Sequence, residues 1–177
     1  MRTGRLHMLL RPVSVGVVAV GLAGVLSGCD RDKPDDLRGR VGQWFALGDT
    51  LYFNSTMHCT AALYELDTDD LKAALPLSGS VGEALARLKV AGIIALRDDG
   101  QSPDVGFVEM MNMNREMGVA LQATALEGKS CMDETAVSAL HYAMSEPRSV
   151  MVYDRAAGLL VLMDPAHGFV VVAGSGD

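Results

Sequence analysis

The clearest hydrophobic pattern in the chain lies toward its C-terminal end, where three short apolar runs follow one another. They are SVMVYD from Ser149, LLVLMD from Leu159 and FVVVAG from Phe169. β-branched and aliphatic residues dominate each run, and the linking segments RAAG and PAHG have the small residues and glycine of tight turns. The pattern therefore predicts an antiparallel meander of three strands.

Two helices are indicated by residues that cap helix termini. Ser80 and Glu83 have the spacing of a capping box, and apolar residues then recur three and four positions apart until Gly92. Ser102 and Pro103 combine an N-cap residue with proline at the first helical position. We therefore expect one helix that ends at Gly92 and another that begins at Ser102.

Shorter signals predict three further helices. Residues 68–76 begin with a threonine and two aspartates and end at a proline. A second helix is expected from Asn114 to Glu127, stopped by Gly128, and a third after Cys131. The residues expected on their inner faces are Met113, Met117 and Leu121 in the second helix, and Ala136, Val137, Leu140 and Met144 in the third.

The remaining apolar segments predict strands. IIAL at 93–96 is typical of a short buried strand, and alternation favours a strand at 58–66, although its alanines also suit a helix. In WFALGDTLYF, at 44–53, a Gly-Asp pair splits two apolar runs, which predicts a hairpin, although the first run also suits a helix. The elements together predict one α+β domain over 41–177, an antiparallel sheet with the C-terminal meander and several short helices on one face.

The N-terminal segment is first basic and then apolar. No acidic residue precedes an uncharged run from Val13 to Leu26, and a charged stretch follows it. A membrane-spanning helix needs about 20 apolar residues, so we favour a signal peptide over that alternative. The basic residues ahead of the run are Arg2, Arg5 and Arg11.

Leu26, Ser27 and Gly28 lead directly into Cys29. This order resembles the lipobox of bacterial lipoproteins. The resemblance implies that residues 1–28 are removed, that the Cys29 thiol is alkylated with diacylglycerol, and that the new N-terminus receives a fatty acid such as palmitate. Several acyl chains together give a stable membrane anchor. We therefore expect a protein of the cell envelope, anchored in the inner or the outer membrane and facing the periplasm.

Processing at Cys29 changes the charge balance. It removes three arginines and no acid, which leaves 12 of the 15 basic residues against 22 acidic ones, a formal charge of −10. Such a chain is not expected to bind nucleic acid, and anionic headgroups would repel it. Residues 30–40, DRDKPDDLRGR, lack an apolar face and predict a charged tether after the lipidated cysteine, with a reach of roughly 35 to 40 Å.

Only two cysteines, Cys59 and Cys131, are then left for the exported domain. An oxidising compartment favours their pairing in a disulfide. Cys59 also has a histidine neighbour, His58, which raises the alternative of a thiol nucleophile and its base. Adjacent residues on a strand point to opposite faces, and a bonded sulfur cannot attack a substrate, so the disulfide is favoured.

Metal sites have weaker support. Four methionines close together in the chain, with Met57 and His58 elsewhere, offer ligands of the kind that bind copper. The spacing of the methionines is also that of a helix face packed in a core, and we favour this interpretation. Three aspartates near a loop offer oxygens to calcium without the spacing of an EF-hand, and a solvated turn is favoured. The methionines are Met110, Met111, Met113 and Met117, and the aspartates are Asp98, Asp99 and Asp104.

No catalytic motif, cofactor site or metal site is predicted, and His167 and Trp44 are expected in a turn and in the core. The interpretation that results is a lipid-anchored binding or accessory module, with a membrane and an envelope protein complex as partners. An envelope hydrolase with dispersed catalytic residues and a copper-handling protein are the alternatives. A polar cleft that gathers His141, His167 or Asp98 would favour the hydrolase, a flat apolar patch would favour binding, and exposed methionine sulfurs would favour copper.

The mature chain also resembles uncharacterised exported proteins of alphaproteobacteria. The segments that carry this resemblance are CTAALYEL, SPD, SCM and the pair SVMVYD and LLVLMD. The resemblance spans most of the mature chain and implies no activity.

Overall fold

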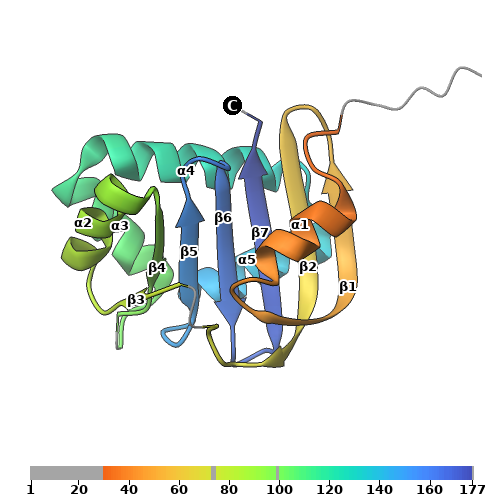
Figure 1. Cartoon of the computed structure of the whole chain (residues 1–177), viewed down its shortest axis with the longest axis horizontal. Coiled ribbons are helices and arrows are strands. Elements are labelled where there is room, and N and C mark those ends of the chain that lie inside the picture. The colour runs from red at the N-terminus through yellow and green to blue at the C-terminus, as the bar shows by residue number, and fades with distance from the viewer. Residues whose placement is uncertain (1–29, 73–74, 99, 177) are drawn as a thin grey trace, which may run out of the picture.

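The computed structural model describes residues 30–72, 75–98 and 100–176. In these ranges the chain forms five helices and a seven-stranded sheet (Figure 1). The helices are α1 (Pro34–Val41), α2 (Val81–Ala91), α3 (Pro103–Met113), α4 (Arg115–Lys129) and α5 (Glu134–Ser145). The strands are β1 (Ala46–Ser55), β2 (Cys59–Thr68), β3 (Leu77–Ser78), β4 (Ile93–Leu96), β5 (Val150–Asp154), β6 (Leu159–Asp164) and β7 (Phe169–Ser175).

The strands are arranged in the order β1-β2-β7-β6-β5-β4-β3. Every neighbouring pair is antiparallel except β3 and β4, which run parallel. The predicted α+β class and the C-terminal meander are confirmed, and the segment favoured as a strand at 58–66 is β2 from Cys59 onward, with His58 in the preceding turn. β7 joins the N-terminal hairpin to the rest of the sheet because it pairs with both β2 and β6.

The sheet has an apolar core on each face. Side chains of α2, α3, α4 and α5 pack on one face, while α1 and the Trp44-Phe45 pair cover the other. Figure 1 shows α1 crossing in front of the sheet, with α4 and α5 behind it. The strands of the meander are buried on both faces, which explains their continuous apolar sequence.

Residues 30–40 are not a tether. From Pro34 onward they form α1, whose Leu37 and Val41 lie four positions apart and are 1% and 0% exposed. Proline at the start and two aspartates in the first turn favour the helix N-terminus. Two apolar residues among so many charged ones are too few to show helical periodicity, so the sequence pattern did not predict this helix on the second sheet face.

Two other predictions in the N-terminal half are wrong. The segment 44–53 is not a hairpin, because β1 runs unbroken to Ser55 and turns into β2 only at residues 56–58. Gly48 lies in an irregular stretch of the β1–β2 pairing, where an added Cβ would come 2.9 Å from the Glu65 Cβ. The predicted helix at 68–76 is also absent from its described residues, since β2 continues to Thr68.

The capping signals located the helices of the middle segment. The Ser80 hydroxyl accepts the Glu83 N–H at 3.3 Å, the Glu83 carboxylate accepts the Gly79 N–H at 3.1 Å, and Gly92 ends α2 with φ 72°. α3 begins at Pro103, directly after the predicted N-cap residue Ser102. β4 follows α2 at the predicted residues.

The inner faces of α4 and α5 differ in part from prediction. Met117 and Leu121 are buried, but Met113 is 56% exposed because it ends α3 instead of starting the next stripe. Gly128 does not stop α4, which continues to Lys129. The buried residues of α5 are Ala136, Ala139, Leu140 and Ala143, so Val137 and Met144 lie at the margin.

Candidate functional site

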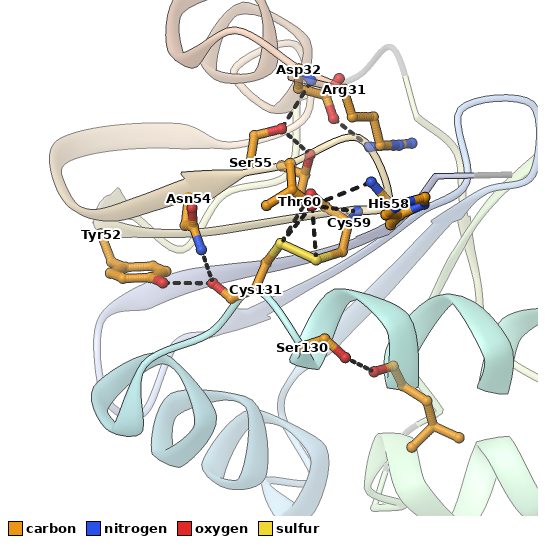
Figure 2. Close-up of a disulfide and its surroundings, with 12 residues drawn as sticks. Arg31, Asp32, Tyr52, Asn54, Ser55, His58, Cys59, Thr60, Ser130 and Cys131 are labelled. Carbon is orange, nitrogen blue, oxygen red and sulfur yellow. Dashed lines mark hydrogen bonds and ion pairs between the residues drawn. A yellow bond between two sulfur atoms is a disulfide. The ribbon is translucent and has the colours of Figure 1, made fainter. Parts of the chain in front are cut away.

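The predicted disulfide between Cys59 and Cys131 is present (Figure 2). It joins the start of β2 to the segment between α4 and α5 across 72 residues, with the two Cα atoms 5.8 Å apart. The Tyr52 hydroxyl and the Asn54 amide donate to the Cys131 carbonyl at 2.5 and 3.1 Å. Both cysteines are buried. A thiol nucleophile at Cys59 is thereby ruled out in the bonded form.

Arg31 fixes the chain to the domain close to this disulfide. Its N–H donates to the Thr56 carbonyl at 2.9 Å, and its guanidinium donates to the Ala157 carbonyl and pairs with Asp32. The Asp32 N–H donates to the Ser55 hydroxyl at 3.0 Å. We call this end of the sheet the N-terminal pole and define it by Arg31, the turns 56–58 and 155–158, and residues 175–176.

The opposite end of the sheet carries an aspartate and a histidine that sequence reasoning did not pair. The carboxylate of Asp164 is fully buried and accepts the Ala166 and His167 N–H groups at 2.9 and 3.1 Å. Its second oxygen lies 2.7 Å from His167 Nδ1. The imidazole, 47% exposed, is 5.1 Å from the Tyr142 ring. The Asp-Pro-Ala-His spacing of this turn is the sequence signal that would have found the pair.

A polar hollow of about 320 Å³ lies beside this turn, on the sheet face that α1 covers. Two arginines, Arg97 and Arg148, line it together with an aspartate. Arg148 Nε donates to Glu146 at 2.9 Å, and this hydrogen bond is the main reason that the pKa of Glu146 lies below its usual value. We call this end the distal pole. The residues that line the hollow are Asp69, Arg97, Gly100, Pro147, Arg148, Met163 and Pro165.

The distal pole carries two separate groups of side chains suited to polar recognition, the arginine-lined hollow and the Asp164–His167 pair. Asp164 holds His167 by Nδ1, so that Nε2 remains to donate or accept a proton. No serine, threonine or cysteine side chain hydrogen-bonds this ring in the described part of the chain. Met163 belongs to the α1 face of the sheet, whereas Tyr142 is on a helix of the other face, so the hollow and the imidazole lie on opposite sides of the turn.

The other residues singled out from the sequence do not converge. Met110 and Met117 are buried in the core, while Met57 and Met113 are 60% and 56% exposed on separate elements. His58 is exposed in the β1–β2 turn and His141 on α5, and Trp44 is in the core as expected. Cys29 and Asp99 lie outside the described residues. Within the described ranges, no three His, Cys, Asp or Glu side chains are grouped closely enough to hold a metal ion.

Comparison with known proteins gives no family for this chain: no protein-family model, curated sequence or solved structure matches it. None of the helices in residues 30–72, 75–98 and 100–176 has both the length and the apolar character needed to cross a bilayer. The function must therefore be argued from the residues themselves.

Proposed function

We propose that this chain is a lipid-anchored extracytoplasmic binding module, attached through Cys29, which recognises a carboxylate-bearing partner of the cell envelope at its distal pole. The observation that carries the proposal is the Cys59–Cys131 disulfide. Structural disulfides persist in oxidising compartments and are rare in the cytosol. Together with the lipobox-like sequence before Cys29, the bond supports export and anchoring.

The chemistry of the distal pole supports the choice of partner. Arg97 and Arg148 line one hollow, and guanidinium groups bind carboxylates with paired, directional hydrogen bonds. Glu146 engages Arg148 at Nε, which leaves the terminal nitrogens of that guanidinium to face a ligand. A volume of about 320 Å³ suits an acidic side chain or a chain terminus of a partner.

Anchoring is tested by replacing Cys29 with serine in cells fed labelled palmitate. We expect no label in Cys29→Ser and full label in the control Cys131→Ser, which lacks the disulfide but keeps the lipidation residue. Label in the Cys29→Ser protein would contradict the proposal.

Recognition is tested by purifying the native lipidated protein in mild detergent and identifying the proteins that accompany it. We expect Arg148→Glu to lose the partner, because the reversed charge repels a carboxylate. Arg115→Glu is the control: it also reverses an exposed arginine, but at the first turn of α4, where a carboxylate suits the helix dipole. Retention of the same partner by both variants would overturn the assignment of the hollow.

One observation favours a second candidate function, a hydrolase. A buried carboxylate that holds a half-exposed imidazole by Nδ1 is also the arrangement of a general base that activates water. Such an enzyme would cleave a panel of nitrophenyl esters, and His167→Asn would abolish that cleavage. Equal rates for the wild type and this variant would remove the candidate.

A further inference from the structure

The covalent distance between the lipidation residue and the folded domain is short. The Arg31 N–H donates to the Thr56 carbonyl, as described above, and its guanidinium donates to the carbonyl groups of Ala157 and Gly158. The guanidinium also pairs with Asp32, and the Arg31 side chain is 14% exposed. Only Asp30 lies between Arg31 and Cys29. Two residues of extended chain span about 7 Å at most, which is comparable with the thickness of one headgroup layer.

We infer that the domain rests directly on the bilayer, with the N-terminal pole against the lipid headgroups and the distal pole turned away from the membrane. This inference rests on the proposed lipidation of Cys29. A flexible tether between the anchor and the domain is not part of this arrangement, because most of the segment expected to be the tether, residues 30–40, is packed on the sheet as α1.

The surface of the N-terminal pole suits a lipid interface held by acyl chains. Met57, 60% exposed, projects from the β1–β2 turn beside the exposed His58, and Ala156 is exposed in the β5–β6 turn. In Figure 1 the β1–β2 turn, the β5–β6 turn and the C-terminal end of β7 lie at the same upper end of the sheet. An apolar side chain at a turn tip can enter the headgroup boundary without any need for a basic patch.

Charge at this pole neither drives nor prevents the contact. Arg155 faces Glu116 at 3.6 Å and Arg31 is paired with Asp32, so the cations there are balanced by carboxylates. Glu127 and Lys129 lie nearby on α4, and Glu127 lines hollows at this pole. The orientation is therefore set by the short covalent link and by the way in which Arg31 is bound.

The strands then fix the height of the recognition site. β7 runs from the distal pole to the N-terminal pole in seven residues, and β2 runs the opposite way in ten. At about 3.3 Å per residue these lengths correspond to roughly 20 to 35 Å. The Arg97 and Arg148 hollow would stand at that height and meet only partners that present a carboxylate there.

Two matched alanines allow a direct test on the lipidated full chain. Ala156 and Ala166 are both exposed and both occupy the second position of a four-residue turn, at the N-terminal and the distal pole respectively. Cysteines placed there are the only free thiols, because Cys29 carries lipid in the proposal and the other two are bonded. Each variant is labelled with a fluorophore and reconstituted in phosphatidylcholine and phosphatidylethanolamine vesicles that contain a headgroup quencher.

We expect the label of Ala156→Cys to be quenched severalfold more than that of Ala166→Cys. A flexible Gly/Ser segment of twenty residues inserted between Asp30 and Arg31 should abolish that difference while the protein still floats with the vesicles. Equal quenching at both positions in the chain without the insertion would overturn the orientation. A protein that fails to float with the vesicles would instead refute the lipid anchor, so the two failures are distinguishable.

Discussion

Tyr64 illustrates at the scale of one residue how burial controls both stability and titration. Its ring is 1% exposed, its hydroxyl has no hydrogen-bond partner among the described residues, and the Arg38 guanidinium lies 5.7 Å from the ring centroid. Burial raises the pKa of Tyr64 to about 12, against a smaller opposing effect of Arg38. The phenol is thus held neutral in a site that does not satisfy its hydroxyl.

Tyr64→Phe should therefore leave the free energy of unfolding unchanged or raise it by about 1 kcal/mol at pH 7, because it removes an unsatisfied buried hydroxyl. The unfolded tyrosine ionises near pH 10 and the folded one near 12. Its neutral form thus stabilises the fold below pH 10, and this contribution is lost as the pH rises toward 12. Urea unfolding at pH 7 and pH 10.5 should show a smaller alkaline loss in the variant, and equal losses would contradict this account.

Asp164 and His167 should contribute unequally to stability. The Asp164 carboxylate accepts hydrogen bonds from two backbone N–H groups and also contacts the His167 imidazole. Among the described residues, the imidazole is hydrogen-bonded to Asp164 alone. We expect Asp164→Ala to cost about 1 to 3 kcal/mol, since two N–H groups of the turn and the imidazole lose their buried acceptor. His167→Ala should cost less. Denaturant unfolding of both variants checks the order, and the reverse order would contradict the role given to the turn.

At the scale of elements, two glycines on helices provide a matched pair. An added Cβ at Gly128 would lie 2.5 Å from the Gly174 backbone nitrogen and 2.6 Å from the Ala173 Cβ, whereas at Gly39 nothing lies within 4 Å. Gly128→Ala should destabilise the domain by about 1 to 3 kcal/mol through overpacking of α4 against β7. Thermal or denaturant unfolding measures this cost, and a neutral result would show that α4 is free to shift.

Gly39→Ala should instead stabilise the domain by about 0.5 to 1 kcal/mol, because alanine favours a helix interior and meets no neighbour in α1. The same substitution in an unstructured tether would have no such effect on unfolding. A gain measured by denaturant unfolding thus distinguishes a helix from a tether at residues 34–41.

The sequence identified elements whose signals were local and repeated. Ser80 with Glu83, the Ser102-Pro103 pair and the three apolar runs of the meander each carry their own start, stop or period, and each element formed as expected. α1 and β1 were missed because tertiary contacts decide them. Leu37 and Val41 define a helix only when the sheet is present to bury them, and Gly48 lies within a strand because β1 pairs with β2 on both sides of it, at Leu47 and Thr50.

At the scale of the whole molecule, the disulfide links the N-terminal hairpin to the helical layer. Closing a loop across 72 residues stabilises the fold by about 4 kcal/mol on the chain-entropy model. Reduction should lower the melting temperature by roughly 10 °C in a domain of this size. Thiol counting on the denatured, unreduced protein checks the bond itself, and two free thiols in material from the envelope would contradict it.

The candidate site was less predictable than the fold. The pairing of the two cysteines followed from their number and from the expected compartment, and it is confirmed. The hollow at the distal pole is lined by residues of four separate segments, among them Asp69, Arg97, Arg148 and Pro165. The spacing of residues within one segment cannot predict such a hollow. The Asp164–His167 pair was local enough to be found, but the rings that pack beside His167 belong to Tyr142 on α5 and Phe169 on β7.

The position of β7 has a consequence for the order in which the sheet is completed. This strand follows the other six strands of the sheet along the chain, yet it lies third in the sheet, between β2 and β6. Until residues 169–175 have paired, the β1–β2 hairpin cannot join the other strands, and two strand edges stay open to mispairing with neighbouring chains. A molecule in which β7 is not yet in place would therefore be exposed to aggregation and proteolysis, whereas the insertion of this one strand closes the sheet in a cooperative step.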